Sequence, residues 1–245
     1  SCTGTLISPS VILTAAHCFD DGRGNVTNFD ASGGLSAMPL NGSQVLFYAG
    51  GNLATDANYP TKDIDYAVQI DKASIHPDYD LNTGNSISFG PDLALLRVYG
   101  DPWIGSLPAT FLPLYSGFDE ASSSPDFATL VGYGMVGNGF SLRYDPNTPV
   151  EKRAGLTEVD APVTRPNMLS SKFLSNTDRF NQGYPSNFLQ AAPGPGDSGG
   201  PLVMNSLPGL IGTNVIVGVL QGGPGPDYGT TNYWTRASYY LDWIE

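Results

Sequence analysis

Residues 192–202 read APGPGDSGGPL, a stretch in which glycines and prolines surround a single hydroxyl residue, Ser198. Glycine and proline commonly mark turns, so the simplest interpretation is a surface loop between strands. A plain turn, however, has no need to place an aspartate and a serine between Gly196 and the pair Gly199–Gly200. Because glycine has no side chain, backbone N–H groups near it can converge on one small concavity. The stretch therefore predicts a loop that is shaped to present Ser198.

The composition indicates many short strands joined by turns. The chain has 245 residues with thirty glycines, twenty prolines and thirteen tyrosines, and only 14% of its residues are charged. This length suits one large β domain or two small ones. The net charge is −12 and the eleven basic residues are scattered singly, which argues against a nucleic-acid-binding surface. Apolar runs such as residues 215–220 are far too short to cross a bilayer.

The two cysteines, Cys2 and Cys18, flank a predicted β-hairpin. Residues 5–7 and the β-branched run 11–13 read as strands, with a turn at residues 8–10 between them. Antiparallel strands would bring the two cysteines together, and a disulfide closing a loop of this size contributes roughly 3 kcal/mol in the chain-entropy model. Two free thiols are the alternative. A disulfide would favour an oxidising compartment, and hence a secreted, extracellular or periplasmic protein.

Two further residues have the chemistry to act with Ser198. His17 lies in TAAHC, between small alanines and a cysteine expected to be crosslinked, which would hold its imidazole rigidly at the edge of a core. The only other histidine, His76, is expected to have a structural role. Asp92 begins the apolar run DLALLRV, and a carboxylate that is partly buried there needs a partner.

Ser198, His17 and Asp92 are the types of residue that nucleophilic catalysis needs. A serine hydroxyl is a weak nucleophile, so it requires a base within hydrogen-bond reach, here His17. The carboxylate of Asp92 would fix the imidazole tautomer and stabilise the imidazolium that forms. The N–H groups of Gly196 and Ser198 would form an oxyanion hole.

The motifs TAAHC, DLALLRV and GDSGGP, in this order, resemble the signature blocks of the trypsin/chymotrypsin-like serine protease family. This is the family from which the general description of the triad is drawn, so the roles above are taken over from it. Weaker similarities cover most of the chain, in SIHPDYD, ATLVGYG, LTEVDAPV, GVLQGG and NYWTRASYYLDWI. The resemblance implies an all-β fold of two packed antiparallel β-barrels with a short C-terminal helix. Residues 1–115 would form the barrel with His17 and Asp92, and residues 116–245 the barrel with Ser198.

The function that this resemblance implies is that of a secreted serine endopeptidase acting on proteins or peptides through an acyl-enzyme intermediate. An esterase that uses the same triad is one alternative, although the order His, Asp, Ser along the chain differs from that of the α/β-hydrolases. A catalytically silent binding protein on the same fold is the other. Such relatives generally lack a triad residue, and none is lacking here. No cofactor and no metal ion is expected.

The specificity pocket is also inferred from the resemblance. Its floor would lie at Ala192 and its walls near Pro193, Gly223 and Asn232, and none of these side chains is charged. A preference for Lys or Arg needs a carboxylate in the pocket. A preference for Glu commonly uses a histidine, and the matching position is Leu220. We therefore expect cleavage after uncharged residues, unless Asp227 turns inward.

Two further expectations concern the partner of Asp197 and a possible calcium-binding loop. Members of the family usually have a strand before the position of Cys2, and in many its freed amino terminus pairs with the aspartate that corresponds to Asp197. We expect a preceding segment, a propeptide or another chain to supply that strand, because Asp197 otherwise has no evident partner. Residues 78–84, DYDLNTG, have the spacing of a calcium loop but lack its glycine and glutamate, so a solvated loop is favoured.

Overall fold

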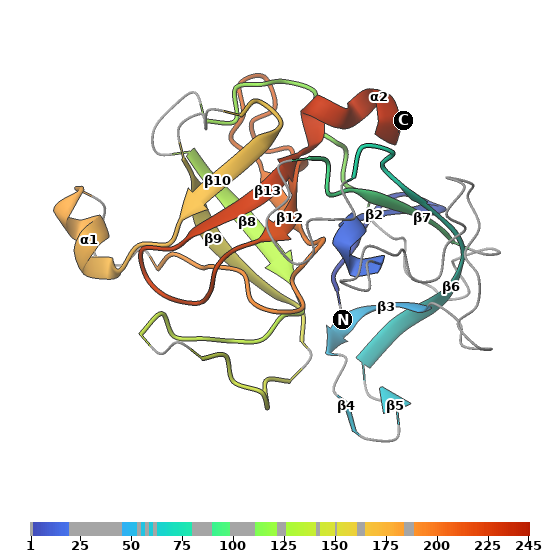
Figure 1. Cartoon of the computed structure of the whole chain (residues 1–245), viewed down its shortest axis with the longest axis horizontal. Helices are drawn as coiled ribbons and strands as arrows, with labels where there is room; N and C mark the ends of the chain where they lie inside the picture. The colour runs from blue at the N-terminus through green and yellow to red at the C-terminus, as the bar shows by residue number, and fades with distance from the viewer. Residues whose placement is uncertain are drawn as a thin grey trace.

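The computed structural model of the protein describes residues 2–19, 46–52, 55–56, 59–60, 63–79, 90–98, 111–121, 126–140, 143–149, 151–160, 165–183 and 189–245. Within these ranges the strands form two large antiparallel sheets that lie beside each other (Figure 1). The prediction of an all-β chain with a short C-terminal helix is confirmed. The calcium-loop sequence at residues 80–84 lies outside the described ranges.

The first sheet has five strands in the order β1-β2-β7-β6-β3. The strands are β1 (Thr5–Ser8), β2 (Val11–Thr14), β3 (Leu46–Asn52), β6 (Asp63–Ile75) and β7 (Ala94–Val98), and β4 (Thr55–Asp56) pairs separately with β5 (Tyr59–Pro60). The predicted hairpin is confirmed: β1 and β2 pair with Thr5 opposite Leu13. The side chains of Leu6, Ile12, Ile70, Ala73 and Leu96 form a buried cluster in this half of the molecule. These β-branched and aliphatic residues suit the half-buried surface of a pleated sheet.

The second sheet has six strands in the order β10-β13-β12-β11-β8-β9. They are β8 (Asp126–Gly132), β9 (Arg153–Val159), β10 (Met168–Lys172), β11 (Pro201–Met204), β12 (Val215–Gly222) and β13 (Thr231–Arg236), and a short helix, α1 (Asn176–Asn181), follows β10. The buried core cluster of this sheet includes Trp234, which is 1% exposed. The four-residue strand β11, which follows Ser198 closely, is buried throughout. The segment that carries the candidate nucleophile is thus anchored in a rigid core.

A third apolar cluster joins the two halves of the molecule. Leu13 and Leu93 from the first sheet pack with Val219 of β12 and with Ile244 of the C-terminal helix α2 (Leu241–Ile244). Residues 111–121 also contact β12: the N–H of Tyr115 donates to the carbonyl of Ile216, and the N–H of Ile216 donates to the carbonyl of Pro113, both at 2.9 Å. Burial of this shared apolar surface holds the two sheets in one arrangement. The division of the chain at residue 115 stays a prediction.

A buried ion pair fixes the end of the second sheet. The carboxylate of Glu120, which is completely buried, accepts hydrogen bonds from the guanidinium of Arg236 at the end of β13. The hydroxyl of Ser238, in the 3₁₀ helix η3 (Ala237–Tyr240), donates to the same carboxylate. Because both oxygens have donors, the charge is satisfied inside the protein.

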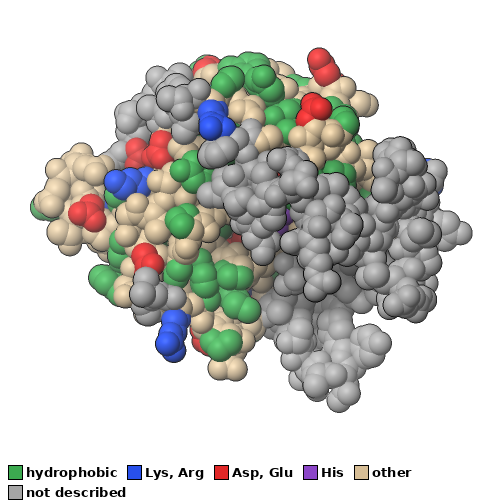
Figure 2. Space-filling model, in the orientation of Figure 1, with side chains coloured by type: hydrophobic (Ala, Val, Ile, Leu, Met, Phe, Trp, Pro, Cys, Tyr) green, Lys and Arg blue, Asp and Glu red, His purple; other side chains and the backbone are tan. Residues whose placement is uncertain are grey.

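The surface of the described residues has no concentration of basic side chains on the face that Figure 2 shows, where Lys and Arg lie apart from one another. This agrees with the absence of a basic stripe in the sequence. None of the helices within the described ranges has the length and apolar character needed to span a bilayer.

His76 supports the C-terminal helix, in line with the structural role expected for it. Its ring centroid lies 5.1 Å from that of Tyr240 and 4.8 Å from that of Trp243. The Nδ1 atom accepts a hydrogen bond of 3.2 Å from the backbone N–H of Asp78, so the neutral ring carries its proton on Nε2. Burial lowers the pKa of His76, and the Asp78 carboxylate opposes this in part. The fold therefore accommodates the neutral imidazole better than the cation.

Because of this histidine, the free energy of unfolding should decrease when the pH is lowered below neutral. The folded protein holds the His76 proton less tightly than the unfolded chain, whose ordinary pKa is 6.5, so stability is lost as the pH falls from 6.5 towards the lowered value. Denaturant titrations between about pH 7 and pH 5 will detect the decline. His76→Gln should be less stable at pH 7 but should lack this part of the decline; parallel curves for both proteins would contradict the assignment.

Candidate active site

His17 and Asp92 meet because β2 and β7 pair in a defined register. Thr14 lies opposite Ala94 at the ends of these strands, so the chain leaving β2 passes beside the residue that precedes β7 by two positions. His17 lies there in the 3₁₀ helix η1 (Ala16–Phe19). Its Nδ1 is 2.6 Å from Asp92 Oδ2, and its backbone N–H donates to Asp92 Oδ1 at 2.8 Å.

This pair has a defined tautomer and orientation. The ionised carboxylate can only accept hydrogen bonds, so His17 Nδ1 carries the proton and Nε2 is left as the basic nitrogen. The Asp92 side chain is 5% exposed, whereas that of His17 is 23% exposed. A buried anion therefore holds an imidazole that reaches solvent, which is the arrangement a general base needs.

Ser198 lies in the loop that leads into β11, and backbone hydrogen bonds define this loop on both sides. The N–H of Asp197 donates to the carbonyl of Gly194 at 3.0 Å, and the N–H of Gly200 donates to the carbonyl of Asp197 at 2.8 Å. Beyond the serine, the N–H of Gly199 donates to the carbonyl of Leu220 on β12 at 2.9 Å. Ser198 itself is half-buried.

Glycine is required at Gly199 for two reasons. Its φ of 79° lies in the left-handed region, and a Cβ there would overlap with the hydroxyl of Thr14 and the carbonyl of Thr3. Gly196, on the other side of Ser198, has a φ of 102°. These glycines thus permit a tight loop that packs directly against the end of β2 and the segment before β1.

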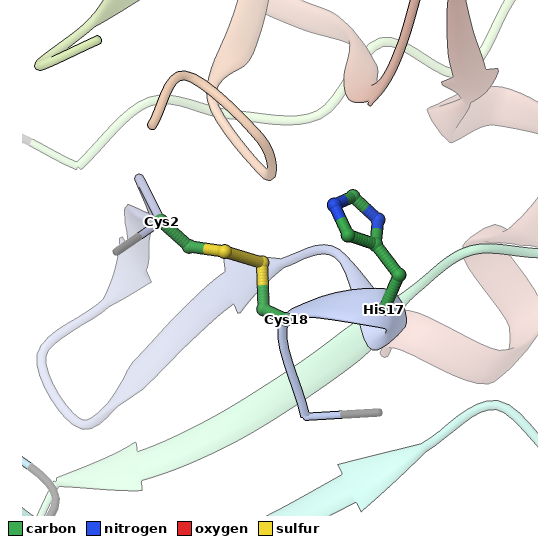
Figure 3. Close-up of side chains that lie close together, drawn as sticks. All are labelled: Cys2, His17 and Cys18. Carbon is green, nitrogen blue, oxygen red and sulfur yellow. A yellow bond between two sulfur atoms is a disulfide. The ribbon is translucent and has the colours of Figure 1, made fainter. Parts of the chain in front are cut away.

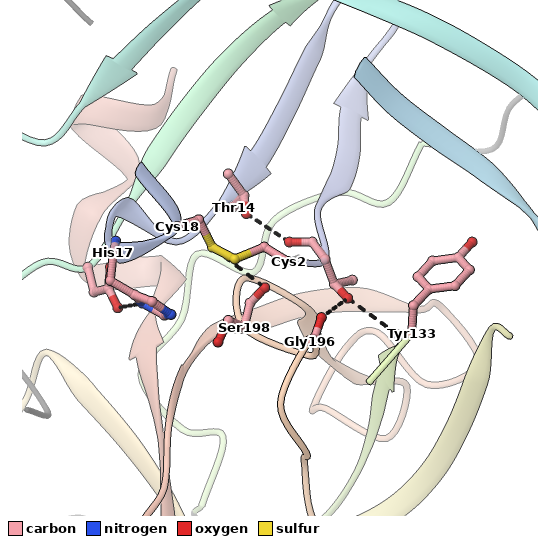
Figure 4. The surroundings of a disulfide bond; sticks show 9 residues. Cys2, Thr14, His17, Cys18, Tyr133, Gly196 and Ser198 are labelled. Atoms are coloured by element: carbon pink, nitrogen blue, oxygen red, sulfur yellow. Dashed lines mark hydrogen bonds and ion pairs between the residues drawn. A yellow bond between two sulfur atoms is a disulfide. The ribbon is translucent and has the colours of Figure 1, made fainter. Parts of the chain in front are cut away.

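The first barrel contacts this loop beside the disulfide. Cys2 and Cys18 are bridged, as the hairpin predicted. The backbone N–H of Thr3 donates to the carbonyl oxygen of Ser198 at 2.8 Å, and Cys18 Sγ lies 3.9 Å from the same oxygen. Figure 4 shows Ser198 next to the disulfide, with His17 on the adjoining turn of chain. The segments of His17 and Ser198, which are far apart in the sequence, therefore lie close together.

Asp197 has partners that the sequence did not indicate. Its side chain is buried, and its Oδ1 and Oδ2 accept hydrogen bonds from the backbone N–H groups of Gly134 at 2.7 Å and Gly194 at 2.8 Å. Burial raises the pKa of Asp197, while these two donors and the Arg153 guanidinium act against the rise. A cavity of about 250 Å³ opens beside the carboxylate, and Tyr144 is among the residues that line it.

Cys2, His17 and Cys18 are the only described group of metal-ligating side chains that lie close enough to share an ion (Figure 3). Thiolates are the form in which cysteines bind metals, and both sulfur atoms here are joined to each other. The group as it stands offers one imidazole ligand, which is too few for a protein metal site.

Comparison with known proteins agrees with this geometry. The family model described as "Trypsin" matches residues 1–244. The chain belongs to the trypsin family. It is 26% identical to a protein named tryptase from Mus musculus over 260 residues, covering 99% of the chain and 77% of that protein. It is 27% identical over 257 residues to serine protease Hayan from Drosophila melanogaster, of which it spans 34%. The resemblance inferred from the three motifs is thereby confirmed.

The residues predicted to form the specificity pocket fall into two pairs in this trypsin-family chain. Ala192 and Pro193 line the cavity beside Asp197. Gly223 and Asn232 lie against each other, because a Cβ on Gly223 would overlap with Asn232 Oδ1. Neither of these two lines that cavity. The cavity beside Asp197 therefore contains only two of the four predicted pocket residues, and the four-residue pocket stays a prediction.

Gln221, on β12, is a further residue that the sequence did not single out. It is 7% exposed, and its Nε2 donates to the carbonyl of Gly90 at 3.1 Å and to the hydroxyl of Thr235 at 3.0 Å. Gly90 precedes Asp92 by two residues, so this amide ties the segment of the candidate carboxylate to the second barrel. A backbone acceptor leaves no trace in the sequence, which is why the contact could not be expected.

Gly199→Ala should destabilise the protein much more than Gly212→Ala. The two glycines have nearly the same φ, 79° and 81°, so alanine costs roughly 1–2 kcal/mol of backbone strain at either. Nothing lies within 4 Å of a Cβ at Gly212, whereas one at Gly199 meets Thr14 and Thr3. With this overlap the loss at Gly199 should reach about 3 kcal/mol or more in chemical denaturation. Equal losses would show that the loop does not pack as tightly as described.

Proposed function

We propose that the protein is a secreted serine endopeptidase with Ser198 as nucleophile, His17 as general base and acid, and Asp92 as the group that orients the histidine. The observation that carries this proposal is the 2.6 Å contact between His17 Nδ1 and the buried carboxylate of Asp92. It leaves Nε2 as the basic nitrogen of a partly exposed ring, on a turn that lies beside the Ser198 loop. Membership of the trypsin family supports the same assignment.

The proposed reaction proceeds in two halves. Ser198 Oγ attacks the carbonyl carbon of the scissile peptide bond while His17 Nε2 takes the hydroxyl proton. The tetrahedral intermediate then collapses: the C–N bond breaks, and the same proton passes from His17 to the leaving amine, which gives an acyl-enzyme. In the second half, water attacks the acyl carbon while His17 takes its proton. The bond to Ser198 Oγ then breaks, the proton passes to that oxygen, and the carboxylic acid product is released. Asp92 stabilises the imidazolium in both halves and does not itself become protonated.

The oxyanion of each tetrahedral intermediate would be bound by the N–H groups of Gly196 and Ser198. Within the described residues, neither N–H donates to an acceptor of the protein. The carbonyl of Pro195 accepts a hydrogen bond from the N–H of Met135 at 2.9 Å. Because carbonyl and N–H point in opposite directions across a trans peptide, the N–H of Gly196 is directed away from Met135. N–H donors that are already held in the required direction need little free energy of reorganisation when the negative charge develops.

Substrates would be proteins or peptides with an uncharged residue before the scissile bond, bound by Ala192, Pro193, Gly223 and Asn232. None of these four residues has a charged side chain, which supports this preference. The disulfide supports secretion into an oxidising compartment, because such bonds persist there.

Replacement of Ser198 by Ala should abolish peptide hydrolysis. The change removes one half-buried oxygen, so the fold should survive, while the rate of casein or peptide hydrolysis should fall by at least about 10³-fold. His17→Ala should be comparably severe and Asp92→Asn less so. A serine-directed phosphonate should inactivate the wild-type protein and leave Ser198→Ala unlabelled.

The same assay separates the alternatives. Phosphonate labelling with no peptide hydrolysis but rapid hydrolysis of simple esters would indicate an esterase. An unreactive, folded wild-type protein would indicate a silent binding protein. Retention of more than about a tenth of the activity in Ser198→Ala would overturn the assignment of the nucleophile.

Substrates that differ only in the residue before the scissile bond should be ranked with Leu and Phe above Arg and Glu. A neutral pocket gives no compensation for the desolvation of a charged side chain, so the value of kcat/KM for Arg should be lower by at least about tenfold. Asp227→Asn serves as the control and should leave this ranking unchanged. A strong preference for Arg that is lost in Asp227→Asn would show that this carboxylate reaches the pocket.

A further inference from the structure

Thr3 connects the first barrel to the nucleophile loop through its side chain as well as its backbone. The residue is 5% exposed and lies between Cys2 and β1. Its hydroxyl donates to the carbonyl of Gly196 at 2.8 Å and accepts from the backbone N–H of Tyr133 at 3.3 Å. Its carbonyl accepts from the hydroxyl of Thr14 at 2.7 Å. All of its polar groups are thus engaged, and two of them hold the carbonyls of Gly196 and Ser198.

The hydroxyl contact matters because Gly196, as a glycine, has few steric limits on its own backbone. Glycine populates both signs of φ readily, so its N–H direction must be fixed by neighbouring contacts. The peptide before Gly196 is fixed by the hydrogen bond from Met135 to the carbonyl of Pro195. The peptide after Gly196 is held by the Thr3 hydroxyl at its carbonyl and by the hydrogen bond of 3.0 Å from the N–H of Asp197 to the carbonyl of Gly194. Both planes that flank Gly196 are therefore held, and its backbone dihedrals have little freedom.

We infer that Thr3 is a positioning residue for the oxyanion hole: its hydroxyl holds the carbonyl of Gly196 and so restricts the backbone dihedrals of Gly196, which keeps the N–H of Gly196 directed at the developing negative charge. This inference rests on the proposed function. Thr3 does not touch the substrate, and it acts through Gly196. An aliphatic side chain in its place leaves the carbonyl of Gly196 and the N–H of Tyr133 without their partner, and the loop gains alternatives in which the N–H of Gly196 turns away.

The effect should appear in kcat and not in KM. Loss of an oxyanion donor in acyl-transfer enzymes lowers kcat about 10²–10³-fold, so a donor that is loosened but not removed should cost about tenfold. Substrate binding in the ground state does not use a negative oxygen, so KM should change less than about twofold. A merely structural role would alter stability without this division between the two constants.

The experiment compares Thr3→Val, which keeps the shape and loses the hydroxyl, with Thr3→Ser, which keeps the hydroxyl. Thr3→Val should lose about tenfold in kcat and should bind a peptide boronate, which forms a tetrahedral adduct on the serine, correspondingly more weakly. Thr3→Ser should retain most of the wild-type kcat. Thr157→Val is the matched control, because Thr157 on β9 is 1% exposed and its hydroxyl is bonded to Ser171 at 2.5 Å. It should lower stability and leave kcat unchanged.

The outcomes distinguish failure of this inference from failure of the proposed function. An active wild-type protein whose kcat is unaltered in folded Thr3→Val overturns the positioning role and leaves the proposed function intact. A wild-type protein that neither hydrolyses peptides nor reacts with the phosphonate overturns the proposed function and this inference with it. If Thr3→Val does not fold, Thr3→Ser and Thr3→Ala form the replacement pair, since both lack the methyl group and only the serine keeps the hydroxyl. Equal kcat values in that pair would also overturn the role of the hydroxyl.

Discussion

The buried carboxylate of Asp197 needs hydrogen-bond donors, and the donors that it uses determine the shape of the loop that carries Ser198. An unpaired charge in the interior would cost several kcal/mol. The chain leaving β8 supplies what is needed: the successive N–H groups of Tyr133, Gly134 and Met135 reach the Thr3 hydroxyl, the Asp197 carboxylate and the carbonyl of Pro195. This short segment thus holds the nucleophile loop directly at two points, and at a third through the Thr3 hydroxyl, which donates to the carbonyl of Gly196.

The backbone of residues 132–134 lies very close to the Asp197 carboxylate, which explains why glycines stand on both sides of Tyr133. A Cβ at Gly132 or Gly134 would overlap with the Asp197 carboxylate. The raised pKa of Asp197 means that burial is not fully compensated by its donors, so the carboxylate reduces stability at neutral pH relative to a solvated one. Strain and unfavourable burial of this kind are common where a fold holds a reactive group in place.

The two halves of the candidate site depend on each other where the two sheets meet. The segments next to the first sheet contribute His17 and Asp92, and they contact the Ser198 loop through Thr3 and the disulfide. The second sheet follows that loop, and Gln221 of β12 reaches back to Gly90 beside Asp92. Apolar packing of Leu13 and Leu93 against Val219 maintains the arrangement over which these polar contacts form. Polar contacts give direction, whereas apolar burial supplies most of the stabilising free energy.

The sequence alone determined the all-β class, the hairpin closed by Cys2 and Cys18, the family, and the three residue types that a serine protease needs. These follow from local patterns: turn residues, alternating apolar runs and short motifs around His17, Asp92 and Ser198. The partners of Asp197, the Gln221 contact and the role of Thr3 were decided only by the tertiary structure. All of them use backbone N–H or carbonyl groups, which every residue has, so no residue type marks them in the sequence. They arise because two sheets pack together and bring segments more than one hundred residues apart, such as Thr3 and Gly196, into hydrogen-bonding distance.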